Sequence, residues 1–106
     1  MATLYYGANG TEIDFDDRAL AHLKVVIVAK LRRDEKFTLS WENESGRSTI
    51  WLHPAIELRF GFDERERPPL NRLWIDQLMA TANSGDGMRV IPEPATGSPA
   101  TAAARG

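Results

Sequence analysis

The sequence predicts an α+β domain with the element order ββαβββαβ, in which two helices pack on a mainly antiparallel sheet. Two observations predict this class. Residues 16–34 contain neither Gly nor Pro and carry a helical apolar stripe, and a second helical pattern follows Asn71. Around these helices, short segments alternate apolar and polar side chains, as strands with one buried face do.

The first predicted helix, residues 16–34, has apolar residues at intervals of three and four, so that they form one stripe toward a core. These residues are Leu20, Leu23, Ile27 and Leu31. Asp16 and Asp17 fit an N-cap and a negatively charged first turn, and basic residues gather at the opposite end. The β-branched run 25–28 favours a strand locally, but the stripe and both helix ends outweigh it.

Val25 and Val28 fall well away from the leucine stripe on a helical wheel, so the apolar surface is wider than one core-facing side requires. Either another part of the same core covers this flank or a second copy of the chain does. Both readings stay open from the sequence. Val25 and Val28 are therefore the candidate residues of a dimer interface.

Six short alternating segments are predicted to be strands. They are residues 3–6, 11–15, 37–42, 49–53, 56–62 and 88–91. The first two are joined by a turn whose Gly7 and Gly10 tolerate positive φ angles. Pro54 removes a donor and ends one strand. The three successive strands between the helices predict an antiparallel meander.

The second helix is predicted from Asn71, its N-cap, to about Ala82, with Leu70 and Ile75 placed as a hydrophobic staple. Gly85 fits a terminator. We expect one domain over residues 1–92. The segment 93–106 is expected to be a disordered tail, because past its prolines it consists of small and polar residues that cannot pack.

Length and composition narrow the functional classes. The chain of 106 residues is large enough to bury a core without disulfides or metals. It has no cysteine, which excludes thiol catalysis and cysteine-based zinc sites and fits a cytoplasmic protein. Its apolar runs are too short for a membrane span. A net charge of −2 gives no global attraction to nucleic acid, so such binding requires a local basic patch.

Several short stretches resemble a family of actinobacterial proteins of about this length and of unknown function. They are FDDR at 15–18, AKLRR at 29–33, WLHP at 51–54, ANS at 82–84 and PEP at 92–94. Members are often labelled as ATP-dependent DNA ligases, which implies a nucleophilic lysine in a Lys-x-Asp-Gly motif. The nearest match, at 84–87, has serine in the place of that lysine. The resemblance thus implies a fold and a cytoplasmic location but supplies no catalytic residue.

Motifs for chemistry are sparse. The two histidines, His22 and His53, have no spacing that predicts a metal site, so neither a metal nor a cofactor is expected. His22 is expected on a polar helix face, and His53 is expected to stabilise a turn beside Pro54. No phosphate-binding loop and no nucleophile elbow is present. An enzyme is therefore the minority hypothesis.

The sheet face opposite the core carries the more interesting residues. The strand alternation assigns to it Thr38, Ser40, Glu42, Thr49, Trp51, His53, Glu57 and Arg59. Trp51 with His53 and Arg59 resembles an aromatic platform that stacks a base or grips a peptide. The alternative is a Trp51 that lies under Arg59 as a cation-π pair or is covered by the first hairpin.

A second basic group, Lys30, Arg32 and Arg33, could bind phosphate, although such charges are common at helix C-termini. Taken together, the sequence predicts a cytoplasmic, non-enzymatic binding domain that acts through self-association or a protein partner. A nucleic-acid-associated module that uses the outer sheet face and the basic helix end is the alternative. A ligase-related protein comes last, and no membrane partner is expected.

Overall fold

The computed structural model describes residues 1–95 and confirms the α+β class with the order ββαβββαβ. In chain order the elements are β1 (Ala2–Tyr6), β2 (Thr11–Phe15), α1 (Asp17–Arg32), β3 (Phe37–Asn43), β4 (Gly46–Leu52), β5 (Leu58–Phe62), α2 (Arg72–Ala82) and β6 (Met88–Arg89). Of the predicted disordered tail 93–106, residues 96–106 lie outside the described part of the chain, whereas Glu93 and Pro94 are held in place by hydrogen bonds from Asn71.

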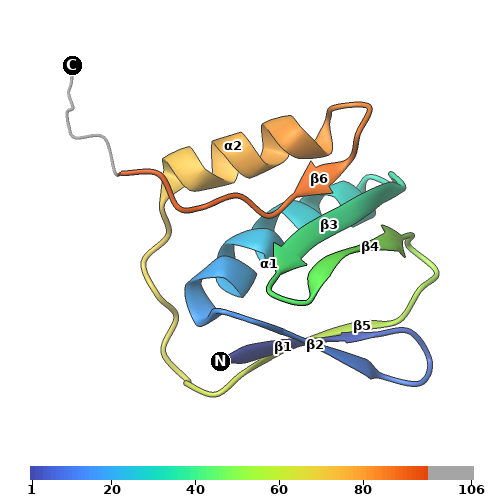
Figure 1. The fold of residues 1–106 in the computed structure, drawn as a ribbon, viewed down its shortest axis with the longest axis horizontal. Helices are drawn as coiled ribbons and strands as arrows, with labels where there is room; N and C mark the ends of the chain where they lie inside the picture. Colours follow the sequence, from blue (N-terminus) through green and yellow to red (C-terminus); the bar gives the residue numbers. More distant parts are fainter. Residues whose placement is uncertain (96–106) are drawn as a thin grey trace.

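The strands form two three-stranded sheets, with the orders β2-β1-β5 and β4-β3-β6. All pairings are antiparallel except that of β3 with β6, which is parallel. Figure 1 shows α2 beside β6 and β3 on one side of the molecule and the β1-β2-β5 sheet on the opposite side. In this view α1 lies behind the β3-β4 hairpin.

The predicted three-stranded meander is wrong, because β5 does not pair with β4. After β4 the chain turns at residues 53–56, where the amide of Ile56 donates to the carbonyl of His53 at 2.9 Å. Pro54 in this turn lacks the amide hydrogen that a continuing ladder would need. The chain then enters the other sheet, where β5 pairs along the whole of β1. The alternation of side chains predicts which face a strand buries but not which strand it pairs with.

Both predicted helix N-caps are confirmed. The Asp16 carboxylate accepts hydrogen bonds from the amides of Arg18 and Ala19. The Asn71 side-chain oxygen accepts from the amides of Leu73 and Trp74. These bonds satisfy amides that the first helical turn leaves without partners, which fixes where each helix begins.

The core contains the predicted stripe of α1. Leu20, Leu23 and Ile27 are fully buried, and Leu31 packs against them as a half-buried residue. They meet buried side chains from both sheets and from α2, among them Leu4, Leu39, Leu52, Leu78 and Met88. The helix assignment over the β-branched run is therefore confirmed, because the tertiary contacts bury the helical stripe.

Candidate functional site

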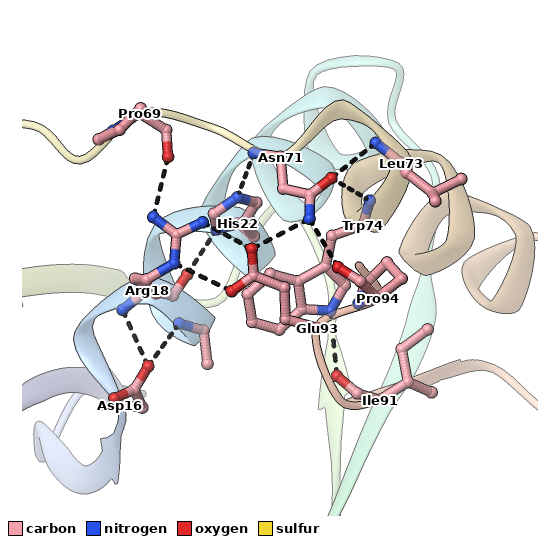
Figure 2. A network of polar contacts seen from close by, with 11 residues as sticks. Asp16, Arg18, His22, Pro69, Asn71, Leu73, Trp74, Ile91, Glu93 and Pro94 are labelled. Carbon is pink, nitrogen blue, oxygen red and sulfur yellow. Dashed lines mark hydrogen bonds and ion pairs between the residues drawn. The ribbon is translucent and has the colours of Figure 1, made fainter. Parts of the chain in front are cut away.

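A polar network joins the start of α1, the start of α2 and the segment that follows β6 (Figure 2). Arg18 donates two hydrogen bonds to the carboxylate of Glu93, from Nη2 at 2.7 Å and from Nε at 3.0 Å. Its Nη1 donates to the carbonyl of Pro69 at 3.1 Å. One guanidinium thus holds two segments that are distant in sequence against α1.

His22 lies at the centre of this network and is fully buried, so the expectation of a polar-face histidine is wrong. Its Nε2 accepts a hydrogen bond from the amide of Asn71 at 2.7 Å, and its Nδ1 lies 2.6 Å from the carbonyl of Arg18. The first bond makes Nε2 an acceptor, so Nδ1 carries the proton and donates. The ring of Trp74 lies 4.5 Å away, centroid to centroid. The packing of α2 against α1 is what buries His22.

Asn71 and Glu93 complete the network. The Nδ2 of Asn71 donates to Glu93 and to the carbonyl of Pro94, each at 3.0 Å, while its oxygen caps α2. The hydrogen bonds from Arg18 and then from Asn71 lower the pKa of Glu93 to about 2. We call Arg18, His22, Asn71 and Glu93 the polar clamp. Its side chains bond to one another and to the backbone, so the polar clamp has a structural role. The sequence did not predict this network.

A groove of about 550 Å³ runs along the other flank of α1. One wall is α1 itself, with Val25 and Val28 at its centre, and the other wall is the loop that follows β5, which ends at Leu70. Val25 is 37% exposed and Leu70 is 52% exposed. The structure thus brings the two candidate interface residues together on one open, largely apolar surface. We call this surface the α1 groove.

The rim of the α1 groove is charged on both sides. The helix wall carries Lys24 and Arg32, and the loop wall carries Glu64, Arg65, Glu66 and Arg67. Within residues 1–95, none of these six side chains forms an ion pair. The Nζ of Lys24 lies 5.8 Å from the ring centroid of Phe62, which lines the groove where the loop wall begins. The groove therefore combines an apolar centre with charges that form no ion pair within residues 1–95.

The outer face of the β4-β3-β6 sheet carries the second candidate surface. Trp51 projects from β4 and is 49% exposed. The register places Ser40 between Thr49 and Arg89, and the hydroxyls of Ser40 and Thr49 are 2.8 Å apart. Arg47 follows on the same face, opposite Glu42 in the register. Arg89 reaches this face only through the parallel pairing of β6, which the sequence did not predict. We call this surface the Trp51 face.

Arg59 does not belong to the Trp51 face. It lies in the other sheet, with its guanidinium carbon 4.1 Å from the ring centroid of Tyr5. The expected platform of Trp51 with Arg59 is therefore not assembled, because β5 pairs with β1. The expected turn role of His53 is confirmed, since its Nδ1 accepts from the amide of Ala55 at 3.0 Å.

The three basic residues predicted at the end of α1 point in different directions. Lys30 is only 6% exposed; its ammonium donates to Asn83 at 2.7 Å and pairs with Glu35 at 2.8 Å. The hydrogen bond from Lys30 lowers the pKa of Glu35. Arg33 lies 3.4 Å from the same carboxylate, and Arg32 lines the α1 groove. These residues do not form one patch, and Lys30 is used inside the fold.

Two further observations concern residues 1–95. Within this range there is no group of three or more His, Asp or Glu side chains arranged to hold a metal ion. No helix in it is long and apolar enough to cross a membrane.

Comparison with protein-family models gives a match. A family model described as Domain of unknown function (DUF7882) matches residues 1–93. The match includes every helix and strand, both walls of the α1 groove and the whole polar clamp. No curated protein and no solved structure matches the chain. The expected membership of a short family of unknown function is confirmed at that level.

Proposed function

We propose, from the premise that the chain belongs to the DUF7882 family, that the domain is a binding module that associates with a second copy of itself through the α1 groove. The observation that carries this proposal is the α1 groove itself. It combines exposed aliphatic side chains, Val25 and Leu70, with rim charges that form no ion pair within the described residues 1–95.

The apolar part supplies the driving force. Complete burial of a valine or leucine side chain is worth roughly 1.5–3 kcal/mol. Among residues 1–95 the exposed large hydrophobic side chains are Met1, Val25, Trp51, Leu70 and Leu73, and two of these line the α1 groove. A partner that covers Val25, Val28 and Leu70 therefore removes a substantial part of the exposed apolar surface from water.

The charged part favours a second copy as the partner. The helix wall is basic, and the loop wall holds two carboxylates, Glu64 and Glu66, beside two arginines. Neither carboxylate forms an ion pair within residues 1–95. A surface that carries both signs can be complementary to itself when a two-fold axis brings opposite charges together. Self-association lets Glu64 and Glu66 of each copy pair with cations of the other copy, whereas a different protein would need to supply its own matching pattern.

Sedimentation equilibrium over a range of protein concentrations tests this proposal. The wild-type chain is expected to approach twice its monomer mass as concentration rises. Val25→Glu is expected to remain monomeric, because dimerisation would bury an unpaired carboxylate. Glu is a good helix former, so the substitution at this exposed helical site leaves the fold intact.

Ala80→Glu is the matched control, since Ala80 is an exposed residue of α2 that does not line the α1 groove. This variant is expected to dimerise like the wild type. A wild-type chain that stays monomeric at every concentration would refute the proposal. So would a Val25→Glu variant that is folded and dimerises with undiminished affinity.

A second candidate function, binding of single-stranded nucleic acid, is favoured by one specific observation. The parallel β6 adds Arg89 to the face that presents Trp51 and Arg47, next to a row of hydroxyl groups. An exposed aromatic ring among arginines is the pattern of a stacking surface with phosphate contacts. Glu42 on the same face weakens the electrostatic attraction, which places this function second.

Binding of a labelled single-stranded oligothymidylate at several salt concentrations tests the second function. Trp51→Ala is expected to cost roughly 1–3 kcal/mol of affinity with little change in the salt dependence. Arg89→Ala is expected to reduce the slope of log K against log salt by about one. Arg59→Ala, in the other sheet, is the control that leaves both unchanged. No binding by the wild type at low salt removes this function.

A further inference from the structure

We infer that the two copies dock with α1 of each over the loop at residues 63–67 of the other, so that Lys24 and Arg32 pair with the partner copy's acidic loop residues. This inference rests on the proposed self-association and adds the orientation and the residues that select it. It follows from the shape of the α1 groove and from the distribution of charge on its two walls.

The α1 groove has a direction. The helix wall extends from Ala21 to Arg32, which corresponds to about 16 Å along the α1 axis at 1.5 Å per residue. The loop wall, from Phe62 to Leu70, faces it across the groove. The groove is therefore a trough parallel to α1, with the apolar residues in the middle and the charged residues along its rims.

Two orientations of a two-fold axis bring such troughs face to face. An axis across the trough places helix wall over helix wall and loop wall over loop wall. An axis along the trough places the helix wall of each copy over the loop wall of the other. Val25 and Val28 are buried in either case, so the apolar contact does not distinguish the two arrangements, and the rim charges decide between them.

The helix wall carries only positive charge within the groove, from Lys24 and Arg32. An axis across the trough therefore brings like charges together along the two helix walls, which opposes association there, while the loop walls that meet in this arrangement carry both signs. An axis along the trough brings these cations to Glu64 and Glu66, which have no ion pair within residues 1–95. Arg65 and Arg67 lie on the same loop, so the pairing depends on the two glutamates.

Two charge-reversed variants test this arrangement by sedimentation at low salt. The helix variant carries Lys24→Glu and Arg32→Glu, and the loop variant carries Glu64→Lys and Glu66→Lys. Each variant alone is expected to self-associate at least about tenfold more weakly than the wild type, because each homodimer then brings like charges together. The equimolar mixture is expected to form a heterodimer within about threefold of wild-type affinity, since both contacts become complementary again.

The helix variant also discriminates between the two axes. If helix wall faces helix wall, reversing both cations leaves a like-charge contact as before, so the helix variant self-associates like the wild type. It would also bind the wild-type chain more tightly than the wild type binds itself. Either result overturns the inference while the proposed self-association stands. A monomeric wild type instead refutes the proposed function, and the inference with it.

Lys36→Glu and Glu44→Lys are the matched controls. Both positions are exposed, lie outside the α1 groove and form no ion pair within the described residues. Each control is expected to retain wild-type affinity to within about threefold. A loss in the controls equal to that in the groove variants would show a general effect of charge and would contradict the assigned pairing.

Discussion

The two flanks of α1 use polar groups in opposite ways. On one flank, Arg18 and His22 bond to Asn71, Glu93 and the backbone, and His22 is fully buried against α2. On the other flank, Lys24 and Arg32 border an open apolar trough. Polar side chains whose partners lie inside the fold hold packed segments together. On the open flank, charges that form no ion pair within residues 1–95 surround exposed aliphatic residues, and this is the surface that the proposed self-association would cover.

The largest difference between the flanks is expected from truncation of aliphatic side chains. Leu23→Ala or Ile27→Ala should lower the free energy of unfolding by roughly 2–4 kcal/mol, because each empties a fully buried site. Val25→Ala should change it by less than about 0.5 kcal/mol in the monomer, since this side chain is partly exposed. Urea denaturation at low protein concentration measures both. Similar losses at all three positions would contradict the division into two flanks.

A smaller but clear effect is expected at the polar clamp. His22→Ala should cost roughly 1–3 kcal/mol of unfolding free energy, because the amide of Asn71 and the carbonyl of Arg18 then lose their buried partner. His53→Ala is the control, since His53 makes a bond within an exposed turn and should cost less. Chemical denaturation of both variants is the measurement. A His22 effect no larger than that of His53 would show that the clamp does not hold α2 to α1.

The smallest effect is expected to depend on pH. The pKa of Glu93 is lowered to about 2 from an ordinary value of 4.5, so its ion pair with Arg18 stabilises the fold above about pH 4.5. That contribution should be lost as the pH falls from about 4.5 to about 2. The melting temperature of the wild type should therefore exceed that of Glu93→Gln near neutral pH, and the gap should close over this range. A gap that is constant with pH would exclude the carboxylate as its source.

Local features predict the elements well. Asp16 and Asn71 each combine a capping side chain with a following helical pattern, so both helix starts were predictable. The division into two sheets was not. Alternation along residues 56–62 gives the buried face of that strand, but β1, its actual partner, is distant in sequence and has the same kind of pattern. Non-local pairing is therefore the part of the fold that the local signals leave open.

The candidate surfaces also differ in how far the sequence predicts them. Val25 and Val28 were predicted together because helical geometry alone places both outside the leucine stripe. The clamp was not predicted, since Arg18 and His22 are four residues apart on α1 but their partners, Asn71 and Glu93, come from other segments. The place of Arg89 on the Trp51 face was not predicted for the same reason, because the parallel pairing of β6 with β3 brings it there. A helix face can be derived from one segment, whereas a network between segments requires the fold.

The central claim is that one flank of α1 is complete within the chain and the other is completed by a second copy. Amide chemical shifts recorded by NMR over a range of protein concentrations test it most directly. We expect concentration-dependent shifts along residues 21–32 on the groove side and along residues 62–70, with the amides of His22 and Asn71 unchanged. Shifts confined to the Trp51 face, or none at any concentration, would contradict the account.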